Sequence, residues 1–98
     1  MPEITTSEWD LFLSQHPEAH ILQTTAWGEL KRAFGWQVVR LQQDNAGAQV
    51  LIRSLFPGIR LAYIPKGPVG NNLSAILPEI DRSCRKFHCV FLKVELDA

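Results

Sequence analysis

Residues 36–65, WQVVRLQQDNAGAQVLIRSLFPGIRLAYIP, decide the fold of this chain. Three stretches within them have the period-two pattern of apolar residues that is typical of β-strands. These stretches are Trp36–Gln42, Ala48–Leu55 and Arg60–Pro65. Turn-forming residues separate them at Asp44–Gly47 and at Phe56–Gly58. Because such short connections join neighbouring strands, we predict an antiparallel three-stranded meander.

Two short helices are predicted before the meander. Thr5 and Glu8 have the spacing of a capping box, and Pro17 ends the first helix near Gln15. Its apolar face comprises Trp9, Phe12 and Leu13. The second helix begins at Thr24 or Thr25 and ends before Gly35. Its apolar face comprises Trp27, Leu30 and Phe34, so we expect both helices to pack through aromatic residues, with all three tryptophans in the core.

The remainder of the chain predicts a loop, a helix and a strand. The loop is Lys66–Asn72, and the helix ends near His88, with Pro78 either kinking its first turn or starting its main stretch. The expected buried face of this helix comprises Leu73, Ile76, Leu77, Ile80, Cys84 and Phe87. Val90–Leu96 begins with three consecutive apolar residues, as strands covered on both faces do. The helix is long enough for a crossover, so this strand is expected to be parallel to the third.

The predicted fold class is therefore α+β, an α/β layer in the order ααβββαβ with a mixed, mainly antiparallel sheet. The 98 residues allow one small domain, 1–98. Ten basic and ten acidic residues give a formal charge of zero, which argues against a nucleic-acid module that works by phosphate neutralisation. No apolar run is long enough for a membrane span and the N-terminus resembles no signal peptide. We therefore expect a cytoplasmic protein with two reduced, partly buried thiols at Cys84 and Cys89.

Few residues of this sequence point to chemistry. Lys66 and Gly67 begin a loop ahead of a helix, where backbone N–H groups could bind an anion, although a simple glycine–proline turn explains the same residues. Lys31 borders the apolar stripe of the second helix, where it either reaches for water or presents a cation to a phosphate. Glu95 and Asp97 share a strand face and could act as an acid–base pair, or be simply solvated.

The sequence supports no metal site and no cofactor site. Cys84, His88 and Cys89 are closely spaced soft ligands, but no second cluster completes a tetrahedral set. Neither a nucleophile elbow nor a P-loop is present.

Four motifs follow one another in the order found in one enzyme family. They are HILQTTAWGELK (His20–Lys31), FGW (Phe34–Trp36), YIPKGPV (Tyr63–Val69) and FLKVE (Phe91–Glu95). Together they resemble the FemABX-type aminoacyltransferases, which build the interpeptide bridges of peptidoglycan. The resemblance extends from about Thr6 to Asp97.

The resemblance implies transfer of an amino acid from aminoacyl-tRNA to the stem peptide of lipid II or of its UDP-MurNAc-pentapeptide precursor. It implies the N-terminal part of the first of two acyl-CoA N-acyltransferase-like domains, inactive alone, without a cofactor and with tRNA contacts elsewhere. Lys31 resembles the lysine that meets the precursor diphosphate, Lys66 and Gly67 the turn beside the substrate cleft, and Glu95 a candidate general base. The family usually has proline after that acid, whereas this chain has Leu96.

Two other functions fit the same residues. In a CoA-dependent N-acetyltransferase half-domain, Lys66–Gly70 would hold a pyrophosphate, although Pro68 removes one N–H donor. In a non-catalytic interaction module, an exposed sheet edge would bind a partner. We also expect a homodimer through the final strand, because unpaired edges recruit other strands.

Overall fold

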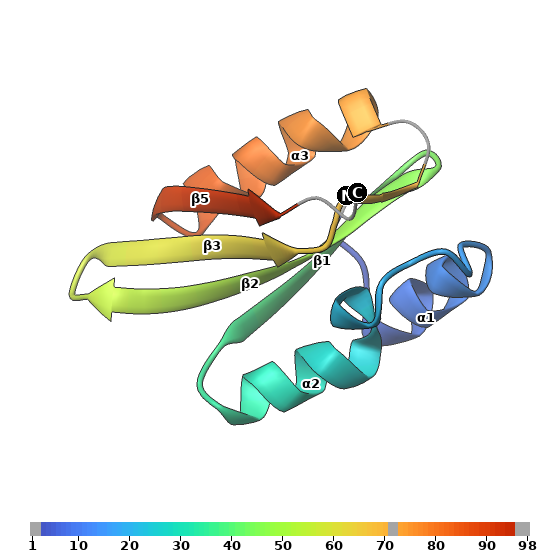
Figure 1. Cartoon of the computed structure of the whole chain (residues 1–98). Helices are drawn as coiled ribbons and strands as arrows, with labels where there is room; N and C mark the ends of the chain where they lie inside the picture. The colour runs from blue at the N-terminus through green and yellow to red at the C-terminus, as the bar shows by residue number, and fades with distance from the viewer. Residues whose placement is uncertain (1–2, 71–72, 96–98) are drawn as a thin grey trace.

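The computed structural model describes residues 3–70 and 73–95, and a single sheet lies between helices on its two faces (Figure 1). In chain order the elements are α1 (Thr6–Ser14), the 3-10 helix η1 (Ile21–Gln23), α2 (Thr25–Ala33), β1 (Gln37–Gln43), β2 (Ala46–Phe56), β3 (Ile59–Pro65), β4 (Val69–Gly70), α3 (Leu73–Lys86) and β5 (Cys89–Glu95). The predicted α+β class is confirmed. The observed order also contains η1 and β4, two short elements that the sequence pattern did not predict.

The sheet has the strand order β1-β2-β3-β5, with β4 paired to the start of β2. β1, β2 and β3 form the predicted antiparallel meander. β5 pairs in parallel with β3, also as predicted, because α3 carries the chain back across the sheet. Among the described residues, no helix is both long and apolar enough to cross a membrane.

The first hairpin differs from its prediction. Pairing between β1 and β2 continues to Gln43 and Ala46, so the turn contains only Asp44 and Asn45. Ala46 and Gly47 are strand residues because they pair on their other side with β4, inside the segment predicted to be a loop. A Cβ on Gly70 would lie 1.9 Å from the Asn45 carbonyl oxygen, so this contact requires glycine. The end of the predicted loop, residues 71–72, lies outside the described residues.

The helix boundaries follow the predicted capping residues. The Glu8 N–H donates to Thr5 Oγ1 at 3.2 Å and the Thr5 N–H donates to Glu8 Oε1 at 2.9 Å, which completes the capping box. Thr24 caps α2 by accepting from the Trp27 N–H at 3.3 Å. Gly35, with φ of 93°, follows the end of α2 as predicted.

α2 does not pack through its apolar stripe, so that prediction is wrong. Leu30 and Phe34 are 46% and 76% exposed, whereas Gly28 is buried. A Cβ on Gly28 would lie 2.4 Å from Gln49 Oε1 and 2.7 Å from Arg40 Nη2. The helix therefore docks through its glycine, because polar side chains of the sheet occupy the space that a larger residue would need.

α3 covers the opposite face of the sheet, where the main apolar core lies. This core is formed by Val39, Leu41, Ala46, Ala48, Val50, Ile52, Ala62, Ile64, Ile76, Ile80 and Cys84. The predicted helix face is confirmed at Ile76, Ile80 and Cys84, and Phe87 packs against them. Leu77 is 52% exposed and was predicted wrongly. Pro78 lies inside the helix, and the side chain of Leu73 lies outside the described part of the chain.

Two further burial predictions need correction. β5 was expected to be covered on both faces, but its apolar side chains are exposed, with Phe91 at 57%. The physical reason is that β5, at the end of the strand order, lies at the margin of the core under α3, which only Cys89 of this strand contacts as a partly buried side chain. Of the tryptophans, Trp9 is fully buried, whereas Trp27 and Trp36 are only half-buried.

A polar cluster is buried between the sheet and the N-terminal helices. Gln23 is fully buried, and its side-chain amide bonds both β2 and the end of β3. Gln23 Nε2 donates to the Pro65 carbonyl at 2.8 Å and to the Gln49 carbonyl at 3.3 Å, and Oε1 accepts from the Gln49 N–H at 2.8 Å. The Trp9 indole N–H donates to the Gln23 carbonyl at 2.8 Å. One glutamine thereby joins α1, η1, β2 and β3.

Arg40 extends this cluster toward the helices and is itself only 3% exposed. Its Nε donates to Gln49 Oε1 at 2.9 Å, its Nη1 to Thr6 Oγ1 at 3.0 Å and its Nη2 to Glu29 Oε2 at 3.2 Å. All three guanidinium nitrogens therefore have a hydrogen-bond partner, and the Glu29 carboxylate balances the buried positive charge.

Replacing Gln23 with leucine is expected to destabilise the chain by about 3 kcal/mol, because the Gln49 and Pro65 backbone groups would stay buried without partners. Urea unfolding followed by circular dichroism measures this loss. Gln37→Leu, at an exposed position of β1, is the matched control and should change stability by less than about 0.5 kcal/mol. Equal losses in the two variants would contradict a role for the buried amide.

Candidate functional site

Three polar side chains meet where β3 and β5 end. The parallel register places Pro65 opposite Glu95, so Lys66, the next residue, lies beside the Glu95 carboxylate. Lys66 Nζ is 3.8 Å from Glu95 Oε1, and the Tyr63 hydroxyl donates to the same oxygen at 3.4 Å. Residues from two distant motifs are thus brought together, and we call Tyr63, Lys66 and Glu95 the strand-end cluster.

The strand-end cluster lies on the face of the sheet that α2 also covers. Side chains alternate along a strand, so Gln49 and Leu51 share a face, and Leu51 pairs with Tyr63. Tyr63 and Glu95 therefore lie on the same face as Arg40 and Gln49. The opposite face, with Ala62 and Ile64, is occupied by the apolar core under α3.

The surroundings of Tyr63 in this cluster raise the pKa of its phenol. Burial raises the pKa of the Tyr63 phenol above its usual value, and the negative charge of Glu95 and the hydrogen bond to it raise the pKa further. Lys93 Nζ lies 5.5 Å from the centre of the tyrosine ring. Tyr63 is thus held as a neutral hydrogen-bond donor toward the carboxylate.

Gly67 is fixed by packing. A Cβ at this position would lie 2.8 Å from the side-chain carbon Cδ of Gln23, so only glycine lets the turn approach the buried amide. Lys66 before it has φ of 53°, a left-handed conformation that turns the chain away from β3. Close packing therefore accounts for Gly67, and binding of an anion by its N–H stays a prediction.

Lys31 lies on α2, beside the ring of Trp27. α2 holds its Nζ 5.0 Å from the centre of the Trp27 ring, and both side chains are half-buried. The Trp27 Nε1 atom is buried and has no hydrogen-bond partner among the described residues. No hydrogen bond or ion pair joins Lys31 to Lys66 or Glu95 among the residues that the structure describes, although α2 covers the sheet face on which the strand-end cluster lies.

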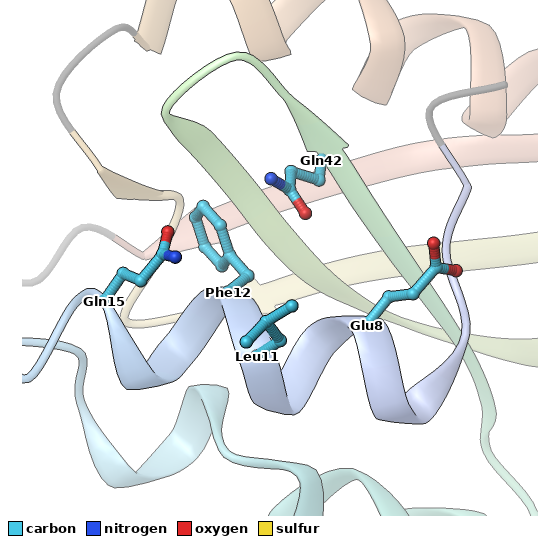
Figure 2. A pocket seen from close by; sticks show the side chains of 5 residues that line it. All are labelled: Glu8, Leu11, Phe12, Gln15 and Gln42. Carbon is cyan, nitrogen blue, oxygen red and sulfur yellow. The ribbon is translucent and has the colours of Figure 1, made fainter.

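A separate cavity of about 180 Å³ lies between α1 and β1 (Figure 2). It is lined by Glu8, Leu11, Phe12, Gln15 and Gln42. The Glu8 carboxylate already serves the capping box, and the Thr5 N–H and hydroxyl lower its pKa. This cavity contains none of the residues that the sequence predicted to be functional.

The two cysteines are free thiols at the end of α3 and the start of β5, as predicted. Burial, followed by the influence of Cys89, raises the pKa of the Cys84 thiol to about 11. Such a thiol is almost wholly protonated at neutral pH and is a poor nucleophile. Within the described residues, no group of three or more metal-ligating side chains comes together.

Comparison with known proteins agrees with the resemblance found in the sequence. The model of the FemAB family matches residues 4–95. The chain belongs to the FemAB family. Lipid II:glycine glycyltransferase of Staphylococcus aureus is 35% identical over an alignment that covers 65% of this chain and 17% of that protein. The crystal structure of FemX is 29% identical with a TM-score of 0.64, and the match covers 88% of this chain and 24% of that one.

Tyr63 is the residue of this site that the sequence reasoning missed. Tyr63 begins the YIPKGPV motif, and the motif by itself assigns it no role. A signal was present, because Tyr63 and Pro65 share a strand face and the parallel pairing brings that face beside Glu95. Asp97, the expected partner of Glu95, lies outside the described residues.

Replacing Glu95 with glutamine is expected to lower the pKa of Tyr63, because the variant removes the neighbouring negative charge. The pKa should stay above the usual value, since burial is the larger cause. The chain has a single tyrosine, so the ultraviolet absorbance of tyrosinate reports this group directly. Glu79→Gln, on α3, is the control, and an unchanged Tyr63 pKa in Glu95→Gln would show that the two side chains do not interact in solution.

Proposed function

We propose that this chain contributes the precursor-binding part of an aminoacyltransferase that adds amino acids from aminoacyl-tRNA to the stem peptide of a peptidoglycan precursor. Membership of the FemAB family supports the proposal, as does the name of the staphylococcal relative, lipid II:glycine glycyltransferase. The observation that carries it is the contact between Lys66 and Glu95. Two residues that the family resemblance assigns to one reaction are far apart in sequence and adjacent in the structure.

The chemistry of such a transfer requires a deprotonated acceptor amine, its attack on the aminoacyl ester, and stabilisation of the resulting oxyanion. In our proposal Glu95 accepts the proton from the amine, and the amide bond forms as the aminoacyl ester bond breaks. The tRNA leaves as its free hydroxyl after taking up that proton. Tyr63 and Lys66, which both contact Glu95 Oε1, orient the carboxylate. Lys31, held over Trp27, binds the diphosphate of the precursor as a point charge.

We also propose that residues 1–98 are part of an acyl-CoA N-acyltransferase-like domain of a longer, two-domain enzyme, on the cytoplasmic side of the membrane. The parallel β3–β5 pair joined to an antiparallel meander supports this assignment. The chain spans only 17% of the length of the staphylococcal relative. On its own, it is therefore proposed to bind precursor without transferring an amino acid, while tRNA is bound by other parts of the enzyme.

Lys31→Ala is expected to weaken binding of UDP-MurNAc-pentapeptide about tenfold or more, because it removes a charge-assisted contact to phosphate. Isothermal titration calorimetry measures the affinity. Lys86→Ala, at the far end of α3, is the control and should bind like the unchanged chain. Equal affinity of the unchanged chain for CoA would contradict the proposed precursor site. Transfer of an amino acid from charged tRNA by the 98-residue chain would contradict the proposal that it binds precursor without catalysing transfer.

We further propose that two copies associate through β5. Its position at the end of the strand order and its exposed side chains, including Phe91 and Leu92, support this arrangement. Sedimentation velocity at rising protein concentration should show a dimer, and the double variant Phe91→Lys, Leu92→Lys should remain monomeric. A monomer throughout the concentration series would rule the association out.

A further inference from the structure

The tip of the β2–β3 hairpin carries exposed apolar side chains. Leu55 and Phe56 are 44% and 66% exposed. β1 pairs with β2 only as far as Ile52, so residues 53–56 extend beyond β1 by roughly 13 Å at the usual rise per strand residue. Figure 1 shows the hairpin projecting at one end of the sheet, away from α1.

A cavity lined in part by Arg60 and His88 lies next to the tip of the hairpin. This cavity of about 400 Å³ is lined by Ser54, Gly58, Arg60 and His88, none of which carries a carboxylate. It lies between the hairpin and the turn that joins α3 to β5. Arg60 Nη1 donates to the Phe87 carbonyl at 3.1 Å, so the guanidinium is held in place at the cavity.

The charge at this end of the sheet is not balanced locally. Neither Arg53 nor Arg60 has an ion-pair partner among the residues that the structure describes. Arg53 instead lies 5.6 Å from the centre of the Trp36 ring. The formal charge of zero therefore conceals an uncompensated basic surface at the hairpin end. Arg53 is on the α2 face of the hairpin, as Leu51 is, and Arg60 is on the α3 face, as Ala62 is, so the two cations lie on either side of the hairpin end. We call the residues around this end, Arg53, Leu55, Phe56, Arg60 and His88, the hairpin-end surface.

We propose that the hairpin-end surface docks on an anionic phospholipid bilayer. Arg60 and His88 would contact a lipid phosphate at the cavity, and Leu55 and Phe56 would enter the boundary between head groups and acyl chains. Apolar side chains beside basic ones are the combination that interfacial binding uses, with burial to about 5–10 Å, which the length of the hairpin permits. The exposed aliphatic Leu55 favours a bilayer over a nucleic acid, whose bases stack on aromatic rings.

Co-sedimentation with vesicles tests this inference and involves neither muropeptide nor tRNA, so its result is independent of the proposed transferase role. The chain should bind vesicles of phosphatidylcholine with phosphatidylglycerol and bind pure phosphatidylcholine much more weakly. Added salt should reduce binding, because it screens the attraction. Equal binding to both vesicles, no binding to either, or binding to tRNA in place of the anionic vesicles would overturn the proposal.

Variants separate the apolar and the basic contributions. The double variant Leu55→Ser, Phe56→Ser should weaken binding about tenfold or more, and Arg53→Gln about fivefold. Leu77→Ser and Arg82→Gln, exposed on α3, are the matched controls and should bind like the unchanged chain. Arg60 also donates to the Phe87 carbonyl just after α3, so Arg60→Gln is compared with Arg60→Lys. Arg60→Lys keeps the positive charge and should retain most of the vesicle binding that Arg60→Gln loses. Equal losses in the control variants would refute docking through this surface.

Discussion

The buried amide of Gln23 is the constraint on which the rest of the structure depends. It satisfies backbone groups of Gln49 and Pro65 that the helices would otherwise leave buried without partners. A side chain with both a donor and an acceptor is needed, because it bonds a carbonyl and an N–H together. The N-terminal helices are thereby attached to the sheet by directional bonds as well as by apolar contact.

The same interaction also sets the position of the strand-end cluster. Pro65, whose carbonyl accepts from Gln23, is the last residue of β3, and Lys66 follows it. Gly67 then packs against the Gln23 side chain. The turn that carries Lys66 toward Glu95 is thus fixed from inside the protein, which connects a buried polar contact to the candidate chemistry at the surface.

The two faces of the sheet are built by different means. Under α3 the contact is apolar, and the predicted pattern of Ile76, Ile80 and Cys84 describes it well. Under α2 the contact contains Arg40 and Gln49, and the helix approaches through Gly28. Helix periodicity identifies a hydrophobic face only where the surface that it meets is apolar, which explains why the stripe of α2 was misassigned.

The sequence by itself determined the four long strands, the helix caps and the parallel return of β5, because these depend on local periodicity, turn residues and crossover length. It also singled out Lys31, Lys66, Gly67 and Glu95. Only the tertiary structure decided that Tyr63 joins Lys66 and Glu95, that Lys31 lies over Trp27, and that Gly28 rather than Leu30 faces the sheet. Those outcomes depend on register and on which polar groups are buried together, and neither is encoded in the spacing of residues along one element.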